Sequence, residues 1–316
     1  MKTTKIILLA MLISLGLNTM AQVAINIDGS APDESAILDL KSTDKGFLPP
    51  RMNELERDAI NSPVAGLVVW CNNCGATGEL QVYNGTAWVN MIGGAAASFV
   101  CGTSGVTDID GNTYNTVQIG TQCWMNENLK TTTYNNGTPI PNVTSNSAWS
   151  NLTTGAYVWY NNDITWKDLY GGLYNWYATV DPNGLCPSGW HVPTNDEWTA
   201  LTDYIGGTGS PHGNELKSCR QVNSPLGGGC NTTEHPRWSE NNTHYGTDDY
   251  GFSGLPGGFR LNDGAFYNIG YYGDWWSSTE SSSYNAWGRN LLYNYGSVGV
   301  NYYNKPSGFS VRCLRD

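Results

Sequence analysis

The side chains best suited to chemistry in this 316-residue chain are four histidines, eight cysteines and a pair of acidic residues beside tryptophans. No two of the histidines, His191, His212, His235 and His244, stand at metal-ligand spacing. His235 and His244 have acidic neighbours, so a metal site in that loop is an alternative. Nucleophile-elbow, H-E-x-x-H and phosphate-loop motifs do not occur. The sequence therefore predicts no catalytic residue, no resident metal and no cofactor.

Two carboxylates offer the best case for an enzyme. Asp274 and Glu280 lie on either side of the Trp-Trp-Ser-Ser stretch at 275–278. A glycosidase with paired carboxylates needs two such groups roughly 5–9 Å apart across a cleft. This pattern leaves a glycan-active enzyme as an alternative to a non-catalytic protein.

The first 21 residues have the pattern of a secretory signal peptide. Lys2 and Lys5 precede an apolar run over residues 6–17, and Ala21 completes a cleavage site of small residues. The run is too short to span a bilayer comfortably, and no later stretch is apolar for long enough. We expect a protein that is secreted or held at the cell surface after cleavage near Ala21, without membrane insertion.

In an exported protein, we expect the eight cysteines to form a framework of disulfides. Eight cysteines allow 105 pairings, and the spacing suggests one of them. Short bridges would close a tight turn, a first hairpin and a glycine-rich loop, which leaves one long bridge. The expected pairs are Cys71–Cys74, Cys101–Cys123, Cys219–Cys230 and Cys186–Cys313. A redox-active or zinc-binding role for the Cys-x-x-Cys pair is the alternative, although neither a second such pair nor a nearby histidine accompanies it.

Charge and composition restrict the partners of the protein. The chain has 16 Lys and Arg against 27 Asp and Glu, a formal net charge of −11. Nucleic-acid binding needs a basic face that releases counterions from phosphate, and adsorption to anionic lipid also needs basic residues. We therefore expect neither partner. Aromatic residues make up 12% of the chain, which favours packed cores over disorder.

A stretch of small residues that begins at Gly93 divides the chain after its leader. Before it we expect short strands at 36–40, 66–70, 79–83 and 86–91, and a short helix at 54–60. The expected organisation is a leader at 1–21, a small β-rich module at 22–92, a Gly/Ala/Ser linker at 93–105 and a larger domain at 106–316.

One helix is expected in the larger domain. Thr194 is a candidate N-cap, and Glu197 three residues later completes a capping box. Trp198, Leu201 and Ile205 then share one face.

Upstream, Asp108 and Asp110 belong to an expected hairpin at 106–119. A calcium loop is the alternative there, but its twelfth position holds Ile119 where the EF-hand needs Glu.

The last part of the chain is rich in tyrosine and asparagine. Residues 262–304 contain eight Tyr and seven Asn among serines and glycines, the residue types of adaptable recognition surfaces. Tyr rings stack on sugars, and Asn amides bond hydroxyl groups. The predicted ligand-binding residues are Tyr271, Tyr272, Asp274, Tyr284, Asn285, Asn290, Asn294, Tyr295, Asn301 and Tyr303, and all but Asp274 are expected to form one exposed patch. The simpler alternative is that this composition reflects loops.

Alternation along an expected hairpin at 286–293 and 298–303 assigns its two faces. The residues expected to point inward are Trp287, Arg289, Leu291 and Tyr293. Those expected to face solvent, together with Asn301 and Tyr303, are Gly288, Asn290, Leu292 and Asn294.

Three segments of the N-terminal module share a pattern, at residues 42–52 (S-T-D-K-G-F-L-P-P-R-M), 56–60 (E-R-D-A-I) and 80–89 (L-Q-V-Y-N-G-T-A-W-V). They resemble the stalk modules of phage tail-fibre-like and bacterial surface-fibre proteins. Such fibres are commonly trimeric, so the resemblance implies a homotrimer formed through this module. A module this small has little core of its own, which agrees with a need for partner chains.

Longer blocks run in order through the larger domain. They are D-I-D-G-N-x-Y from Asp108, W-M-x-E-N-L from Trp124, C-P-x-G-W-H-V-P-T from Cys186, G-F-S-x-L-P-G-G from Gly251, W-W-S-S-T-E from Trp275, A-W-x-R from Ala286 and G-F-S-V-R-C-L-R-D from Gly308. Over residues 106–316 the chain closely resembles the Fibrobacter succinogenes major paralogous (FISUMP) domain family, which is common in Bacteroidetes-type bacteria.

The resemblance implies an α+β, loop-rich fold like that of C-type lectins and formylglycine-generating enzymes. In that fold a long disulfide joins an early segment to the last strand, which favours Cys186–Cys313. The lectin calcium signatures E-P-N, Q-P-D and W-N-D are absent. No cysteine lies between Cys230 and Cys313, where the formylglycine enzymes have a reactive pair. Neither activity therefore follows from the fold.

The sequence thus predicts an exported, non-catalytic, adhesin-like protein whose C-terminal hairpin and loops bind a glycan or a surface protein. One alternative is a structural component of the envelope or of a fibre, without a specific ligand. The other is a glycan-active or formylglycine-type enzyme. A trimeric stalk would strengthen weak binding through multivalency.

Overall fold

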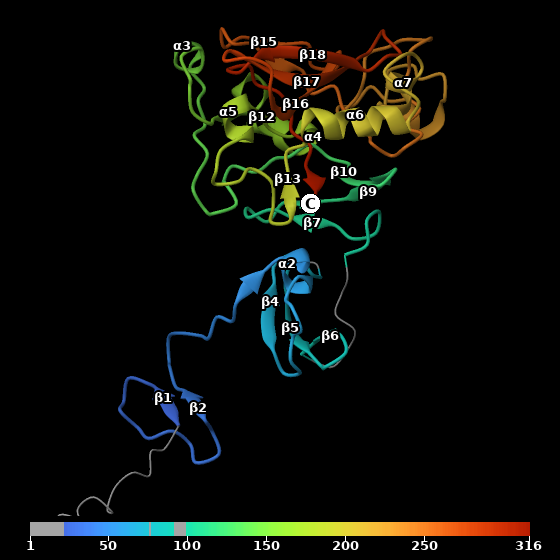
Figure 1. The fold of residues 1–316 in the computed structure, drawn as a ribbon. Helices are drawn as coiled ribbons and strands as arrows, with labels where there is room; N and C mark the ends of the chain where they lie inside the picture. The colour runs from blue at the N-terminus through green and yellow to red at the C-terminus, as the bar shows by residue number, and fades with distance from the viewer. Residues whose placement is uncertain (1–21, 76, 92–98) are drawn as a thin grey trace, which may run out of the picture. The chain divides into compact units, whose positions relative to one another are not determined.

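The computed structural model describes residues 22–75, 77–91 and 99–316 (Figure 1). The chain forms two compact units, Met1–Pro50 and Arg51–Asp316. The boundary follows Pro49-Pro50, inside the stretch at 22–92 that the sequence analysis treats as one module. The expected leader at 1–21 and residues 93–98 of the expected linker lie outside the described residues.

The first unit contains a parallel pair of strands, β1 (Val23–Ile25) and β2 (Leu38–Leu40). Two strands of three residues cannot bury a hydrophobic face by themselves. Its exposed large apolar side chains are Val23, Ile25, Ile27, Ile37, Leu38, Leu40, Phe47 and Leu48. So many exposed apolar side chains on so small a unit indicate an association surface.

The second unit begins with a four-stranded sheet in the order β3-β4-β5-β6. Its strands are β3 (Arg51–Met52), β4 (Val68–Cys71), β5 (Glu79–Tyr83) and β6 (Trp88–Asn90), and only the β3–β4 pair is parallel. A short helix, α2 (Glu54–Asp58), begins at a capping box formed by Asn53 and Glu56. The strands and the helix expected in this region are confirmed to within a few residues.

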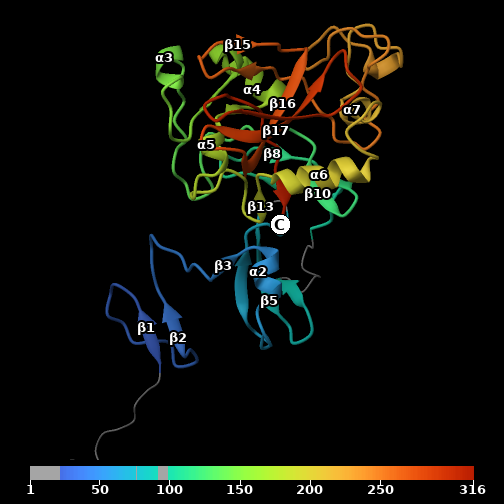
Figure 2. The ribbon, with the colours of Figure 1, turned by 45° about the horizontal axis from the view of Figure 1, so that its top comes forward.

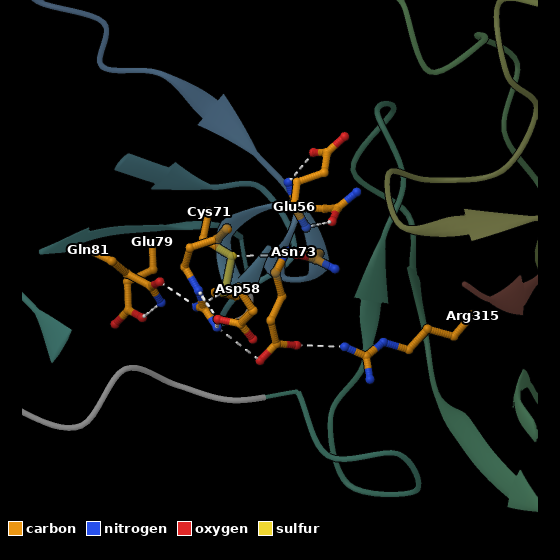
Figure 3. The surroundings of a disulfide bond; sticks show 11 residues. Glu56, Asp58, Cys71, Asn73, Glu79, Gln81 and Arg315 are labelled. Atoms are coloured by element: carbon orange, nitrogen blue, oxygen red, sulfur yellow. Dashed lines mark hydrogen bonds and ion pairs between the residues drawn. A yellow bond between two sulfur atoms is a disulfide. The ribbon is translucent and has the colours of Figure 1, made fainter. Parts of the chain in front are cut away.

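A buried arginine connects this sheet to the Cys71–Cys74 disulfide, whose surroundings are shown in Figure 3. Arg57 donates from Nη1 to Gln81 Oε1 at 2.5 Å and to Cys74 Sγ at 3.1 Å, and its Nη2 lies 2.8 Å from Asp58 Oδ1. From the end of the chain, Arg315 Nη2 donates to Glu54 Oε2 at 2.6 Å. These bonds join α2 to β5, to the Cys71–Cys74 turn and to the C-terminal strand.

The remainder of the second unit is loop-rich and mixed α/β, with several small sheets. Its strands are β7 (Val106–Thr107), β8 (Thr113–Tyr114), β9 (Thr116–Ile119), β10 (Gln122–Met125), β11 (Tyr157–Val158), β12 (Leu173–Tyr174), β13 (Trp190–His191), β14 (Phe259–Arg260), β15 (Phe266–Tyr267), β16 (Tyr272–Glu280), β17 (Asn285–Leu292), β18 (Gly299–Asn304) and β19 (Leu314–Arg315). Its helices are α3 (Asn146–Trp149), α4 (Lys167–Tyr170), α5 (Trp176–Thr179), α6 (Asn195–Tyr204) and α7 (His212–Leu216), with 3-10 turns at Tyr160–Asn162, Ile164–Trp166 and Gly228–Cys230.

The last strand returns to the beginning of the domain. β19 lies between β10 and β13 in a sheet of order β13-β19-β10-β9. Cys313, directly before β19, is bonded to Cys186. The other disulfides are Cys71–Cys74, Cys101–Cys123 and Cys219–Cys230, so all four expected pairings occur.

Phe99 packs on Trp190 at 5.7 Å between ring centroids, and with the Cys101 bridge this makes residues 99–105 part of the folded domain.

The expected helix is confirmed as α6. The Thr194 hydroxyl accepts from the Glu197 N–H, and the Glu197 carboxylate accepts from the Thr194 N–H. Trp198, Leu201 and Ile205 are buried to 3% exposure or less. In both ribbon views α6 lies next to the sheet β16-β17-β18, which it contacts (Figure 1, Figure 2).

Strand β16 sends its two tryptophans to opposite sides of the sheet. Trp275 belongs to a core cluster with Trp198 and Leu291, and Trp276 to another with Phe309. This is the period-two alternation of a strand, and here each side meets a hydrophobic core. The middle of the sheet is therefore a buried layer.

A fully buried arginine joins several of the sequence motifs. Arg312 donates from Nε to Asn128 Oδ1 at 3.0 Å, from Nη2 to the Ser253 carbonyl at 2.9 Å, and from Nη1 to the Phe252 carbonyl. Asn128 Oδ1 also accepts from Trp275 Nε1 at 2.9 Å. Burial lowers the pKa of Arg312 to about 9. Its partners are mainly carbonyl oxygens that would otherwise lack donors.

Replacing this arginine tests its structural role. Arg312→Met would leave the buried carbonyl groups of Phe252 and Ser253 unsatisfied, and at about 1–3 kcal/mol for each we expect it to lower the free energy of unfolding by about 2–6 kcal/mol. Urea titration of the oxidised protein measures the change. Arg51→Met, at an exposed position, is the matched control and should change stability little. Equal effects of the two substitutions would contradict the assignment.

Candidate functional site

The candidate site is built on the predicted C-terminal hairpin. β17 pairs antiparallel with β18 in the register Gly288 to Asn301, and with β16 in the register Asp274 to Asn290. The two expected strands of the hairpin are confirmed, with each end shifted by one residue.

The predicted assignment of the hairpin faces is wrong for its central residues. Asn290, expected to face solvent, is 9% exposed and donates from Nδ2 to the Tyr303 hydroxyl at 2.8 Å. Gly288 is buried as well. The prediction assumed that one face was open, but Trp276, Tyr303 and Phe309 pack over this side. Gly299, opposite Asn290, leaves the space that the amide occupies: an added Cβ would overlap Asn290 Oδ1.

Asp274, predicted to bind ligand, is also buried, with 2% exposure. Its Oδ2 has no hydrogen-bond partner among the described residues. Burial raises the pKa of Asp274 to about 8, although hydrogen bonds from Asn290 and Tyr303 oppose this shift. At neutral pH the group is therefore mainly a neutral acid inside the sheet and not an exposed carboxylate.

The suggested carboxylate pair does not form. Asp274 and Glu280 pair with Asn290 and Ala286 of β17, which are four residues apart, so about 13 Å of extended strand separates their backbones. Paired glycosidase carboxylates are roughly 5–9 Å apart. Glu280 instead accepts from Lys305 Nζ at 2.5 Å.

The remaining predicted residues are spread along the hairpin and its turns. Those exposed are Tyr271, Tyr284, Asn294, Tyr295 and Asn301, and those half-buried are Tyr272, Asn285 and Tyr303. Tyr284 precedes β17, whereas Asn294 and Tyr295 follow it, so they lie at opposite ends of an eight-residue strand. The expected patch is thus two groups at the two ends of β17, with Asn301 between them on β18.

Each group is held by specific contacts. At one end the rings of Tyr271 and Tyr293 meet edge to face at 5.0 Å. Beneath that turn the buried Lys217 donates from Nζ to the carbonyls of Tyr295 and His244, both at 2.7 Å, and burial lowers its pKa to about 7. At the other end Asn304 Nδ2 donates to Asn285 Oδ1 at 3.0 Å.

Between the two ends lies a surface that the sequence analysis missed. Tyr302 is 59% exposed, and its ring meets that of Trp287 edge to face at 5.9 Å. Trp287 was expected to point inward but is half-buried, because it faces the margin strand β18, whereas α6 packs on the same side of β17 at Arg289. The strand register would have predicted this ring contact, because Trp287 and Tyr302 are directly opposite each other.

The alternative metal sites gain no support from the geometry. Among the described residues no group of three or more His, Cys, Asp or Glu side chains could hold a metal ion. His235 Nδ1 lies 2.5 Å from the Tyr170 hydroxyl. Asp108 caps a turn, where it accepts from the N–H groups of Asp110 and Asn112.

Comparison with protein-family models gives two matches. Residues 117–315 match the Fibrobacter succinogenes major domain. The chain belongs to this family. Residues 25–110 match the phage tail like trimerisation region, which suggests that the chain forms a homotrimer. No curated protein and no solved structure matches the chain.

The family and the disulfides together suggest an extracellular protein. All eight cysteines are paired, as is usual for proteins in oxidising compartments. In the part of the chain that the structure describes, no helix is both long and apolar enough to cross a membrane.

The buried acid of the site predicts a pH dependence of stability. The folded pKa of Asp274 lies above its unfolded value, so the folded protein keeps a proton that the unfolded chain releases between about pH 4 and pH 8. Stability should therefore fall as pH rises through this window, by at most about 1.4 kcal/mol per pH unit. Asp274→Asn should flatten the profile and be more stable than the wild type at pH 8.

Urea unfolding of the oxidised protein at pH 4, 6 and 8 measures this effect. Asp168→Asn, a change at an exposed carboxylate, is the control and should follow the wild-type profile. If the profile of Asp274→Asn ran parallel to that of the wild type, the buried acid would not be the cause.

Proposed function

We propose that the protein is an exported, non-catalytic, adhesin-like protein that recognises a glycan or a surface protein through the β17–β18 hairpin and its flanking turns. The observation that carries the proposal is a set of exposed Tyr and Asn side chains on a sheet whose interior is fully packed. Such side chains give large contact areas and adaptable hydrogen bonds at low entropic cost. We further propose that the domain has a C-type-lectin-like fold, and that the leader is cleaved near Ala21 before secretion or surface display.

The sheet that carries the hairpin is held rigidly, which favours recognition of a ligand. The hairpin is bonded to β16, which packs between two cores, and Lys217 fixes the turn that carries Tyr295. A surface that is already ordered loses less entropy on binding than a flexible loop does. The exposed residues are therefore better placed for binding than a loop-rich composition alone would suggest.

Two observations favour a non-catalytic role over the enzyme alternatives. Asp274 and Glu280 are too far apart to act as a glycosidase pair, and Asp274 is buried. Every cysteine is in a disulfide, so the thiol pair that a formylglycine-type enzyme uses has no counterpart here. A purely structural role in the envelope remains the alternative that binding experiments address.

A binding screen tests the proposal directly. The mature chain, residues 22–316, is applied to an array of bacterial and host glycans and to immobilised surface proteins. We expect binding that Tyr284→Ala or Tyr295→Ala weakens about tenfold, because each removes a large exposed contact. Tyr204→Ala, at an exposed tyrosine of α6, is the matched control. Absence of any binding would favour the structural alternative.

A homotrimer would present three copies of the hairpin and raise avidity. The exposed apolar side chains of the first unit are the surface we propose for its assembly. Replacing Ile25 and Leu38, which are 62% and 50% exposed, with Ser should shift the mature chain from trimer to monomer in light scattering coupled to size exclusion. Ile164→Ser, which changes a residue of the second unit with 66% exposure, should leave the trimer intact. A trimer that survives the double change would contradict this assignment.

A further inference from the structure

The outer edge of β18 has no strand beside it. The sheet has the order β16-β17-β18, so β16 and β18 are its margins. The margin at β16 is covered, because Gly273 and Trp275 form bridges with Gly258 and Ser310. On the other margin the described chain offers no strand to β18.

The register identifies which backbone groups are open. Just beyond the paired strands, the Lys305 N–H donates to the Tyr284 carbonyl at 3.0 Å. Hydrogen-bonded pairs recur at every second position of an antiparallel pair, so Tyr303, Asn301 and Gly299 turn their N–H and C=O groups toward β17. The N–H and C=O groups of Val300 and Tyr302 therefore point away from the sheet.

The hydrogen bonds between β17 and β16 lead to the same assignment of the backbone groups. The Tyr293 N–H donates to the Tyr271 carbonyl at 2.9 Å, which directs the backbone groups of Leu291 and Arg289 toward β16. The intervening Asn290 is then bonded to β18. On the outer edge of β18 the preceding position is occupied, since the Val298 N–H donates to the Thr208 carbonyl at 2.9 Å. Val300 and Tyr302 are the next two positions, and no described residue bonds to their backbone groups.

This edge lacks the devices that usually protect a strand from pairing. Natural edge strands carry Lys, Pro, inward charges or bulges. β18 reads G-V-N-Y-Y-N, with no charged residue and no proline. The side chains at the two open positions are also accessible, with Val300 at 40% and Tyr302 at 59% exposure.

We propose that the outer edge of β18 binds an extended segment of a protein partner by strand addition. The chemistry that matches open N–H and C=O groups at every second residue is another peptide backbone, which a sugar does not provide. The added strand would place alternate apolar side chains beside Val300 and Tyr302. Because β18 carries no charged side chain, it offers no ion pair to a charged residue, and an uncharged segment is the partner that fits it. This inference rests on the proposed function and names a polypeptide as the ligand class of the hairpin.

The experiment uses the mature chain and a displayed library of random 12-residue peptides. Selected peptides are resynthesised in two forms, with N-methyl groups on alternate residues in either register. Strand addition predicts that one form loses at least about tenfold in affinity and the other does not, because only every second N–H faces β18. This comparison leaves the protein unaltered, so it does not depend on the folding of a variant.

A protein variant gives an independent test. Val300→Pro removes an outward N–H without breaking a bond inside the sheet, and it should weaken the same peptides about tenfold. Val300→Thr keeps the N–H and the branched shape and should bind as the wild type does. Equal binding of both N-methylated forms, insensitivity to Val300→Pro, or the selection of no peptide would overturn the inference.

Two further results separate this inference from the proposed function. Glycan or surface-protein binding that depends on Tyr284 and Tyr295 but not on Val300 would keep the proposed function and reject strand addition. An assembly larger than a trimer that Val300→Pro dissociates would show that a second copy of this chain occupies the edge, which also rejects a foreign peptide.

Discussion

The guanidinium of Arg312 is the interaction on which the second unit most depends. It is fully buried, and it bonds oxygen atoms from the segment around Asn128 and from the loop at Phe252 and Ser253. The next residue, Cys313, carries the long disulfide to Cys186. A buried cation is tolerated only where its donors are satisfied, so three distant segments must reach their final positions together. In a domain with few long helices or strands, these bonds supply order that regular secondary structure does not.

The same region sets the position of the candidate binding surface. Asn128 accepts from Trp275 as well as from Arg312, and Trp275 lies on β16, the strand next to the hairpin. One side of β16 packs against α6 and its neighbours, while Trp276 on the other side packs against Phe309. The hairpin therefore extends from a buried layer, and only its far edge and its ends reach solvent. This arrangement buries Asp274 inside the sheet and leaves the far edge of the hairpin accessible to the partner that we propose.

Sequence patterns predicted the structure correctly where it depends only on residues that are close in sequence. The capping box at Thr194 and Glu197 specified α6, and the short cysteine spacings specified three of the disulfides, because each depends on residues that are close in sequence. The strands of the C-terminal hairpin were also predictable from alternation and turn residues. The burial of Asp274 and Asn290 was not predictable, because alternation shows which residues share a face but not whether another segment covers that face.

What the sequence determined by itself was the helix α6, the strands of the C-terminal hairpin, the disulfide pairings and the membership of the larger domain in its family. What only the tertiary structure decided was which polar residues reach water. Asn290 and Tyr303 bond each other inside the sheet, whereas Tyr302, one residue from Tyr303, is exposed on the edge strand. The reason is physical: burial of a side chain depends on whether another segment, such as the one that carries Phe309, packs on its face, and on whether a strand lies in the middle of a sheet or at its margin.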